Sequence, residues 1–164
     1  KKEFIKSDLN ELIENAKLEL AVIIDEKKGN FKIDKLPKLK VIPYQIVQLF
    51  INLIGNSLKY SQPGITPQIN IGCDKILSTE YPEILDQSIK KFYKITFTDN
   101  GMGFDPQFKD NIFVLFQRLH SKTDYPGTGI GLAICKKIVE NHKGHITADS
   151  EPNHGSVFTV FLPE

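Results

Sequence analysis

Residues 44–60 read YQIVQLFINLIGNSLKY, and the periodicity of this run decides the fold. At about 100° per residue, its apolar side chains fall on one arc, about 60° to about 240° from Asn52. The members of this apolar arc are Ile46, Val47, Leu49, Phe50, Leu53, Ile54 and Leu58. The run therefore predicts a helix from about Tyr44 to Tyr60 that buries one face in a core.

The opposite arc of this predicted helix carries amides where charged residues are usual. The members of this amide arc are Gln45, Gln48, Asn52, Gly55, Asn56 and Lys59. Asn and Gly lower helix propensity relative to Glu and Lys, which indicates that something is held close to this face. An Asn oxygen is a hard ligand that suits Mg²⁺, and Lys59 can meet a phosphate oxygen. The alternative is an ordinary solvated face.

Helix and strand patterns flank this run on both sides. An N-terminal helix is predicted from apolar residues at helical spacing between Leu9 and Leu20, with a capping box at Asp8 and Glu11 and a stop at Gly29. Further strands are predicted at 31–34, 68–73, 92–98, 145–150 and 156–162, and further helices at 108–116 and at 130–141, where Gly144 caps the helix. The sum is an α/β fold of two layers, an α+β sandwich with helices on one face of a mostly antiparallel sheet. We expect a single domain over residues 1–164, cut from a longer protein.

The composition excludes several classes of function. Lys and Arg number 21 against 20 Asp and Glu, so a net charge of +1 gives no basic field for a nucleic-acid backbone. The apolar runs at 46–54 and 130–135 fall well short of the ~18 residues of a membrane span, so we expect a soluble chain. Cys73 and Cys135 lie on a predicted strand and a predicted helix and are expected to be free thiols.

Two glycine clusters add a candidate phosphate site. Residues 98–104 read TDNGMGF and place Asp99 at a strand end, while residues 127–132 read GTGIGL and lead directly into a helix. The N–H groups and the positive end of that helix would face an anion. Each cluster alone is a weak signal, since Asp-Asn-Gly is commonly only a turn and no Lys-Ser or Lys-Thr makes the second cluster a P-loop. Their order after the amide helix strengthens the signal.

In this order the motifs resemble those of the ATP-binding catalytic domain of two-component sensor histidine kinases. That family shares a superfamily with gyrase, the mismatch-repair ATPases and the ninety-kilodalton heat-shock chaperone. The matches are residues 52–60 to the N box, 99–103 to the first glycine box, 108–116 with Arg118 to the F box, 127–132 to the second glycine box and 155–163 to the closing strand. The resemblance covers nearly the whole chain. It implies the Bergerat fold, a mixed sheet under three helices, with a lid over about 105–128 anchored by Phe113 and Phe116.

The resemblance also implies ATP and Mg²⁺ as cofactors and gives roles to individual residues. Asp99 is expected to accept a hydrogen bond from the adenine amino group, while Gly101 and Gly103 let the backbone approach the base. Asn56 is expected to hold Mg²⁺, with Asn52 beside it. The other residues expected to contact the nucleotide are Lys59, Tyr60, Arg118, Gly127, Thr128, Gly129, Ile130, Gly131 and Leu132. The implied catalytic set is Asn52, Asn56, Lys59 and Arg118.

One feature of the family is missing from the chain. The family's phospho-accepting histidine lies on a separate helical hairpin, and the histidines here, which are His120, His142, His145 and His154, match no such context. The pair at 142 and 145 also lacks further ligands for zinc. The expected function is therefore transfer of the γ-phosphoryl group of ATP to a histidine on the dimerisation hairpin of the parent kinase. A response regulator is expected as an indirect partner.

Two alternative functions stay open at this point. The first is a gyrase-like or chaperone-like ATPase, in which a Glu at the place of Asn52 acts as general base; an amide cannot take that proton. The second is a catalytically silent nucleotide-binding module. We expect a cytoplasmic domain that contacts neither nucleic acid nor membrane, and whether the parent protein crosses a membrane is open. Residues 77–91 give no functional indication.

Overall fold

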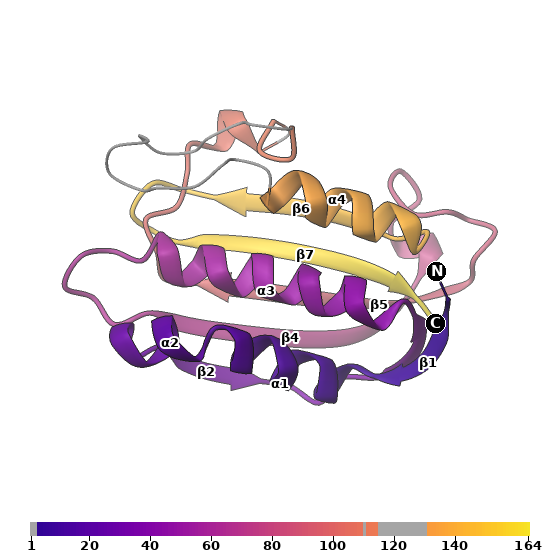
Figure 1. The fold of residues 1–164 in the computed structure, drawn as a ribbon. Helices are drawn as coiled ribbons and strands as arrows, with labels where there is room; N and C mark the ends of the chain where they lie inside the picture. The colour runs from indigo at the N-terminus through magenta and orange to yellow at the C-terminus, as the bar shows by residue number, and fades with distance from the viewer. Residues whose placement is uncertain (1–2, 110, 115–130) are drawn as a thin grey trace.

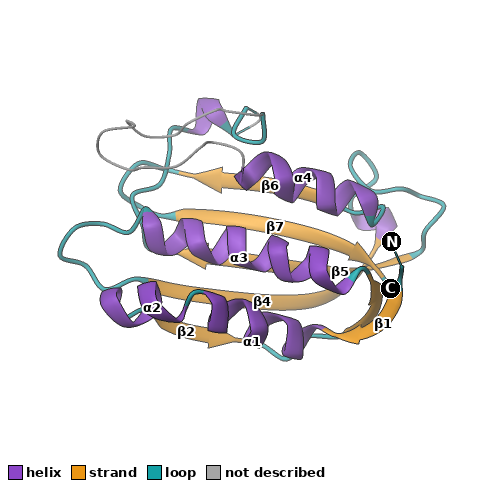
Figure 2. Ribbon diagram, in the orientation of Figure 1, coloured by secondary structure: helices purple, strands orange, loops and turns teal. Residues whose placement is uncertain are grey.

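The computed structural model describes residues 3–109, 111–114 and 131–164, which form two layers. Three helices lie side by side over one face of a five-stranded sheet, as Figure 1 and Figure 2 show. They are α1 (Leu9–Glu19), α3 (Pro43–Lys59) and α4 (Gly131–Asn141). This arrangement confirms the two-layer fold with three helices that the sequence predicts.

The sheet is mixed and mostly antiparallel, as expected. Its strand order is β2 (Asn30–Ile33), β4 (Gln68–Leu77), β5 (Lys91–Asp99), β7 (Ser156–Pro163) and β6 (His145–Ser150). β2 pairs with β4 in parallel, and the other neighbouring strands are antiparallel. The register sets Phe97 opposite both Ile71 and Phe158. Since side chains alternate along a strand, these three lie on the same face and pack against the helices.

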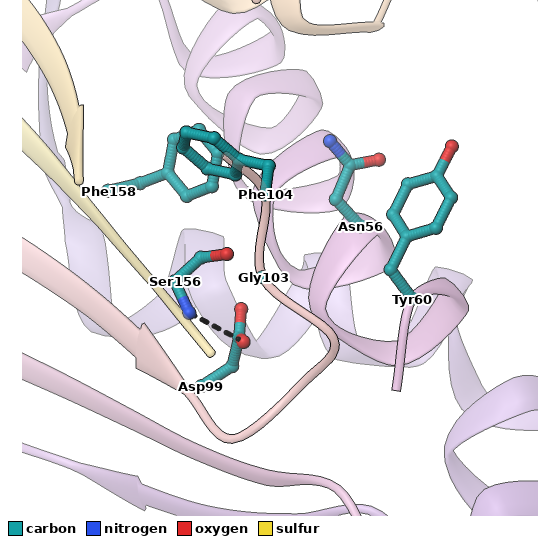
Figure 3. A pocket seen from close by; sticks show the side chains of 7 residues that line it. All are labelled: Asn56, Tyr60, Asp99, Gly103, Phe104, Ser156 and Phe158. Carbon is teal, nitrogen blue, oxygen red and sulfur yellow. Dashed lines mark hydrogen bonds between the residues drawn. The ribbon is translucent and has the colours of Figure 1, made fainter. Parts of the chain in front are cut away.

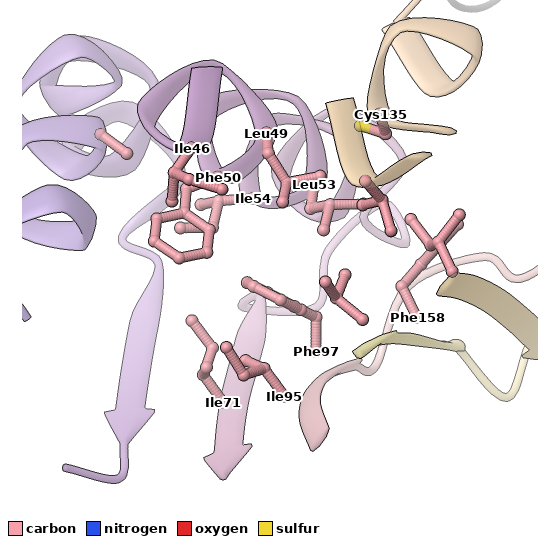
Figure 4. Close-up of a cluster of buried hydrophobic side chains, with 14 of the residues drawn as sticks. Ile46, Leu49, Phe50, Leu53, Ile54, Ile71, Ile95, Phe97, Cys135 and Phe158 are labelled. Atoms are coloured by element: carbon pink, nitrogen blue, oxygen red, sulfur yellow. The ribbon is translucent and has the colours of Figure 1, made fainter. Parts of the chain in front are cut away.

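The core fills the space between the sheet and α3, as Figure 4 shows. The apolar arc of α3 is buried as predicted, except for Val47, which is partly buried. Gln45 from the amide arc is also buried, because α4 packs beside it and Asn141 donates to its side-chain oxygen at 3.4 Å. The rest of the amide arc, from Gln48 to Lys59, is not buried.

Both predicted helix stops lie one residue after a left-handed lysine. The N-terminal helix continues past α1 as a short α2 (Ala21–Lys27) and ends at Lys28, whose φ is 55°. After α4, Lys143 has a φ of 58°, so Lys143 and not Gly144 is the left-handed residue. Position 144 requires glycine for a different reason, since a Cβ there would overlap the carbonyl oxygen of Phe161. The glycine marks the helix end through a close approach rather than through its own backbone angle.

The N-cap of α1 forms with a different partner from the one predicted. The Asp8 side chain accepts a hydrogen bond from the Asn10 N–H at 2.9 Å, rather than from Glu11 as in a capping box. Two short strands that the sequence analysis did not predict, β1 (Ile5–Asp8) and β3 (Lys38–Val41), pair antiparallel as a separate sheet.

The β4–β5 connection covers the sheet face that the helices leave open. It contains a 3₁₀ helix (Ser78–Glu80) and a turn in which the Leu85 N–H bonds the Tyr81 carbonyl at 3.0 Å. Leu85 is buried in a cluster with Phe92 and Phe161. The turn in this connection thus has a packing role.

The helix predicted over 108–116 is not found in the part of it that the structure describes. A 3₁₀ helix (Pro106–Phe108) stands at its start, and residues 111–113 form hydrogen-bonded turns. Within the described ranges, no helix combines the length and apolarity needed to cross a bilayer.

Candidate functional site

A small pocket opens between the C-terminal end of α3, the loop after β5 and the start of β7, with about 320 Å³ of empty space that includes open solvent. Figure 3 shows its lining, which is Asn56, Tyr60, Asp99, Gly103, Phe104, Ser156 and Phe158. Four of these were predicted as site residues, so the fold brings together the N-box helix and the first glycine cluster.

The Asp99 carboxylate is the most constrained polar group of this pocket. Its Oδ1 accepts the Gly101 N–H at 2.9 Å and the Ser156 N–H at 3.1 Å, and its Oδ2 accepts the Ser57 hydroxyl at 2.8 Å. Burial raises the pKa of this carboxyl, and the bonds from Gly101, Ser57 and Ser156 oppose that rise by stabilising the ionised form.

The acceptor capacity of Asp99 is not exhausted. Each carboxylate oxygen offers about two acceptor positions. Oδ1 uses both on backbone N–H groups, whereas Oδ2 has one bond among the described residues. One acceptor position of a partly buried carboxylate is therefore available to a donor that enters the pocket.

Glycines let three chain segments converge around this carboxylate. A Cβ on Gly101 would lie 2.8 Å from the Tyr60 carbonyl oxygen, and the Tyr60 carbonyl also accepts the Met102 N–H at 2.9 Å. Gly103 has a φ of 67°, and a Cβ there would overlap the Glu151 carbonyl oxygen. These glycines allow close contacts within the protein, which in turn shape the pocket wall.

Two residues near the C-terminal end of α3 were predicted to hold phosphate and Mg²⁺, namely Lys59 and Asn56. Lys59 Nζ is 5.7 Å from the centroid of the Tyr60 ring, which lines the pocket. The Asn56 side chain also lines the pocket and has no hydrogen-bond partner among the described residues. Its amide is therefore available to a ligand without breaking a contact in this part of the chain.

Asn52 ties α3 to the start of α4. Its side-chain nitrogen donates to the Gly131 carbonyl at 3.1 Å, and its oxygen accepts from Gln48 at 3.0 Å. Gly131 is thus next to the N box, as the predicted site requires, while Leu132 is buried in the core. Asn52 positions the helix that follows the second glycine cluster.

Several predicted site residues lie outside the described ranges. They are Arg118, Gly127, Thr128, Gly129 and Ile130, together with the lid anchor Phe116 and most of the lid over 105–128. The other predicted anchor, Phe113, packs against Phe158 with ring centroids 6.3 Å apart.

Sequence reasoning missed four residues of the site. Phe104, Ser156 and Phe158 line the pocket, and Ser57 holds the carboxylate. Ser57 and Ser156 lie within motifs that were recognised. Neither was predicted as a site residue, because a single serine in a sequence does not indicate what it will contact. Their role follows only once β7 is paired with β5 beside Asp99.

The residues present fit a bound Mg²⁺ only in part. No group of three His, Cys, Asp or Glu side chains within the described ranges lies close enough to hold a metal ion. A cation here would rest on the Asn56 amide and on ligands that arrive with it, such as phosphate oxygens and water, which is the usual coordination of Mg²⁺ beside phosphates.

The histidines within the described ranges are not part of the pocket lining. His142 is buried, its Nε2 accepts the Ile42 N–H at 3.0 Å, and its Nδ1 lies 2.7 Å from the Ile138 carbonyl. This pairing requires a neutral ring with its proton on Nδ1. Burial lowers the pKa of His142 accordingly. With both nitrogens engaged, His142 is a structural residue.

The family model of histidine kinase-, DNA gyrase B- and HSP90-like ATPases matches residues 42–164. Phytochrome-like protein Cph1 of Synechocystis sp. is 36% identical over 157 residues, which are 96% of this chain and 19% of that protein. Cyanobacterial phytochrome A of Nostoc sp. is 38% identical over 160 residues, 98% of this chain and 19% of that protein. Circadian input-output histidine kinase CikA of Synechococcus elongatus is 30% identical over 159 residues, 95% of this chain and 19% of that protein. The chain thus spans about one fifth of the length of these relatives.

Solved structures share the fold. The nucleotide-free catalytic domain of histidine kinase ThkA superposes with a TM-score of 0.75 at 25% identity, over 98% of this chain and 95% of that one. Full-length ShkA in complex with AMPPNP gives a TM-score of 0.75 at 19% identity, over 99% of this chain and 31% of that one. At 19% identity the second likeness concerns the fold alone.

Proposed function

The chain belongs to the family of histidine kinase-, DNA gyrase B- and HSP90-like ATPases, and on this premise we propose that it binds ATP in the Asp99 pocket and donates the γ-phosphoryl group to a histidine of another domain. It is similar to the ATP-binding catalytic domains of histidine kinases in sequence and in fold. The observation that carries the proposal is the Asp99 carboxylate, which keeps one acceptor position at the pocket that no described residue fills.

Base selection follows from the chemistry of this acceptor. The 6-amino group of adenine donates a hydrogen bond, whereas guanine carries a carbonyl oxygen at the same position, which an ionised carboxylate repels. Asp99 accepts the adenine amino hydrogen on Oδ2. Gly101 and Gly103 support this contact by letting the loop after β5 pack closely enough to shape the pocket.

The phosphates extend from the pocket along the open part of α3. Asn52, Asn56 and Lys59 follow one another on this face, and the start of α4 lies beside Asn52. The residues proposed to complete the phosphate site are Arg118, Gly127, Thr128, Gly129, Ile130, Gly131 and Leu132. Backbone N–H groups at a helix start favour an anion, which suits a triphosphate. Tyr60 stacks near the nucleotide at the wall of the pocket.

Asn56 is the proposed protein ligand of Mg²⁺. When bound, the metal neutralises charge on the phosphate oxygens, which is its general role in phosphoryl transfer. The contribution of the protein is to offer the Asn56 amide oxygen and to orient the nucleotide between Asp99 and Lys59. The rest of the coordination comes from phosphate and water.

Asn52 favours a kinase over an ATPase. Hydrolysis needs a general base to take a proton from water, and a neutral amide cannot take it. In this chain the Asn52 amide is also engaged on both sides, by the Gly131 carbonyl and by Gln48. The acceptor is instead a histidine on the dimerisation hairpin of the parent kinase, whose imidazole nitrogen attacks phosphorus as the ADP oxygen leaves. A response regulator then receives the group, and the domain acts in the cytoplasm.

The test is nucleotide titration of an Asp99→Ala variant. Removing the carboxylate deletes a hydrogen bond to a charged group, worth about 1.5–3 kcal/mol, so ATP affinity falls at least about tenfold. The matched control is Asp149→Ala, since Asp149 is an exposed carboxylate on β6. Isothermal titration with ATP and with GTP measures both affinities. Wild-type protein is expected to prefer ATP.

Two outcomes contradict the proposal at different points. Unchanged ATP affinity in Asp99→Ala, with unchanged folding, places the base elsewhere. Equal binding of ATP and GTP by the wild type removes the role of Asp99 in base selection.

A further inference from the structure

Ser57 occupies an unusual position for a hydroxyl. It lies on α3 among core residues, is 6% exposed, and its Oγ is 2.8 Å from Asp99 Oδ2 and 3.3 Å from the Leu53 carbonyl oxygen. A hydroxyl has one proton, so it can donate to only one of these two oxygens at a time. The bond to the carboxylate is shorter and charge-assisted, which makes it the stronger of the two.

The other bonds to Asp99 leave one oxygen unfixed. Both backbone donors, the Gly101 N–H and the Ser156 N–H, bind Oδ1. Among the described residues, Ser57 is the partner of Oδ2. Without its hydroxyl, Oδ2 would have two open acceptor positions, and neither position would be selected.

We infer that Ser57 is a positioning residue for base recognition: its hydroxyl fills one acceptor position of Asp99 Oδ2 and thereby directs the remaining one at the amino group of the ligand. The inference rests on the proposed binding of an adenine nucleotide and adds to it a residue that touches the carboxylate rather than the ligand. Ser57 contributes to the energy of binding only through Asp99.

The same bond affects the charge of the carboxylate. Burial raises the pKa of Asp99, and the Ser57 bond is one of the three that oppose this rise. Loss of the hydroxyl therefore raises the pKa further, because a hydrogen bond to the ionised form is lost. Since the ionised carboxylate is the stronger acceptor for the adenine amino hydrogen, loss of Ser57 makes ATP binding weaken at a higher pH.

The experiment compares two variants with two ligands. Ser57→Ala removes the hydroxyl at nearly constant volume, and Ser57→Thr keeps it. The ligands are ATP and the triphosphate of purine riboside, which has hydrogen in place of the 6-amino group. Each affinity is measured by isothermal titration between pH 5 and pH 8, after circular dichroism has checked the fold.

The expected result is a loss that depends on the amino group. Ser57→Ala binds ATP about tenfold more weakly than wild type at pH 7, the size expected if the charged hydrogen bond between Asp99 and the amino group is weakened. It binds the purine riboside triphosphate within about twofold of wild type, and Ser57→Thr binds ATP as wild type does. The pH at which ATP affinity is half lost moves upward in Ser57→Ala.

Other outcomes overturn the inference. An equal loss for both ligands means that Ser57 only supports the shape of α3, and no loss for ATP means that the bond does not matter. Ser57→Thr covers the case in which Ser57→Ala does not fold. Weak ATP binding by a folded Ser57→Thr, with an unchanged pH profile, also overturns the inference, because this variant keeps the hydroxyl. Equal binding of both ligands by the wild-type protein would refute the proposed base recognition itself. That outcome is distinct from the others, which concern the Ser57 variants.

Discussion

Gly155 shows how single backbone positions hold the pocket together. Its φ is 85°, and a Cβ would overlap the Asp99 carbonyl oxygen. Two costs therefore add in Gly155→Ala, namely a left-handed backbone for alanine and a steric overlap with neighbouring backbone. We expect the variant to lose about 3 kcal/mol or more of the free energy of unfolding, measured by urea denaturation.

Gly64 supplies the matched control for that prediction. Its φ is 78°, but nothing lies within 4 Å of a Cβ built there. Gly64→Ala thus carries only the backbone cost, about 1 kcal/mol. A similar loss of unfolding free energy in both variants would mean that the turn before β7 can move away from Asp99. ATP affinity would then not depend on the close contact between Gly155 and Asp99.

At the scale of elements, the β4–β5 connection stabilises the sheet from the face opposite the helices. Leu85 is 5% exposed in the cluster with Phe92 and Phe161, while its neighbour Ile84 is 37% exposed. We expect Leu85→Ala to lower the free energy of unfolding by about 2–3 kcal/mol, because a buried leucine leaves a cavity. Ile84→Ala is expected to cost clearly less, and urea denaturation followed by circular dichroism compares the two.

The same variants separate packing from ligand binding. Phe161 and Phe158 lie three positions apart on β7 and so point to opposite faces of the sheet. The Leu85 cluster is thus on the far side of the sheet from the pocket, which Phe158 lines. ATP affinity should stay within about twofold of wild type in Leu85→Ala. A larger drop would show that the connection influences the site.

The elements could be predicted where their pattern is local. The apolar arc of α3 repeats at helical spacing, and β5 and β7 alternate, so each indicates its own buried face without knowledge of the fold. The strands β1 and β3 were not predicted because each has only four residues, and their pairing joins positions 30 to 36 residues apart, from Asp8–Lys38 to Ile5–Val41. No local pattern indicates such a pair.

The site was predictable through its motifs but not through its geometry. Asp99 and Asn56 stand in runs whose order along the chain is informative, and both line the pocket. Ser57 was not predicted, because its function depends on an atom 42 residues away that only tertiary packing brings to it. Gly144 was interpreted as a helix cap, whereas the structure gives it a steric role beside Phe161. Long-range approach of backbone atoms is the common reason for these differences.

At the scale of the whole molecule, two halves of the chain build one site. Asn56 and Ser57 come from α3, Asp99 ends β5, and Ser156 begins β7. The pairing of β5 with β7 brings Ser156 to Asp99, and the Asn52 bond to Gly131 brings α4 to α3. Nucleotide binding should therefore require the complete sheet and not a single motif.

The arrangement of histidines leads to a prediction for the whole chain. Phosphoryl transfer needs an acceptor aligned with the γ-phosphate. Of the histidines that the structure describes, His142 has both ring nitrogens engaged, His145 lies on β6, and His154 lies in the β6–β7 turn. We expect the 164-residue chain to bind ATP·Mg²⁺ and hydrolyse it only slowly, because Asn52 cannot act as a base. It should form no acid-labile phosphohistidine, while a matching histidine hairpin added in trans becomes labelled by γ-³²P-ATP. Rapid hydrolysis by the chain alone, lost in Asn52→Ala, would contradict the kinase and favour an ATPase, since the amide would then have to act on water.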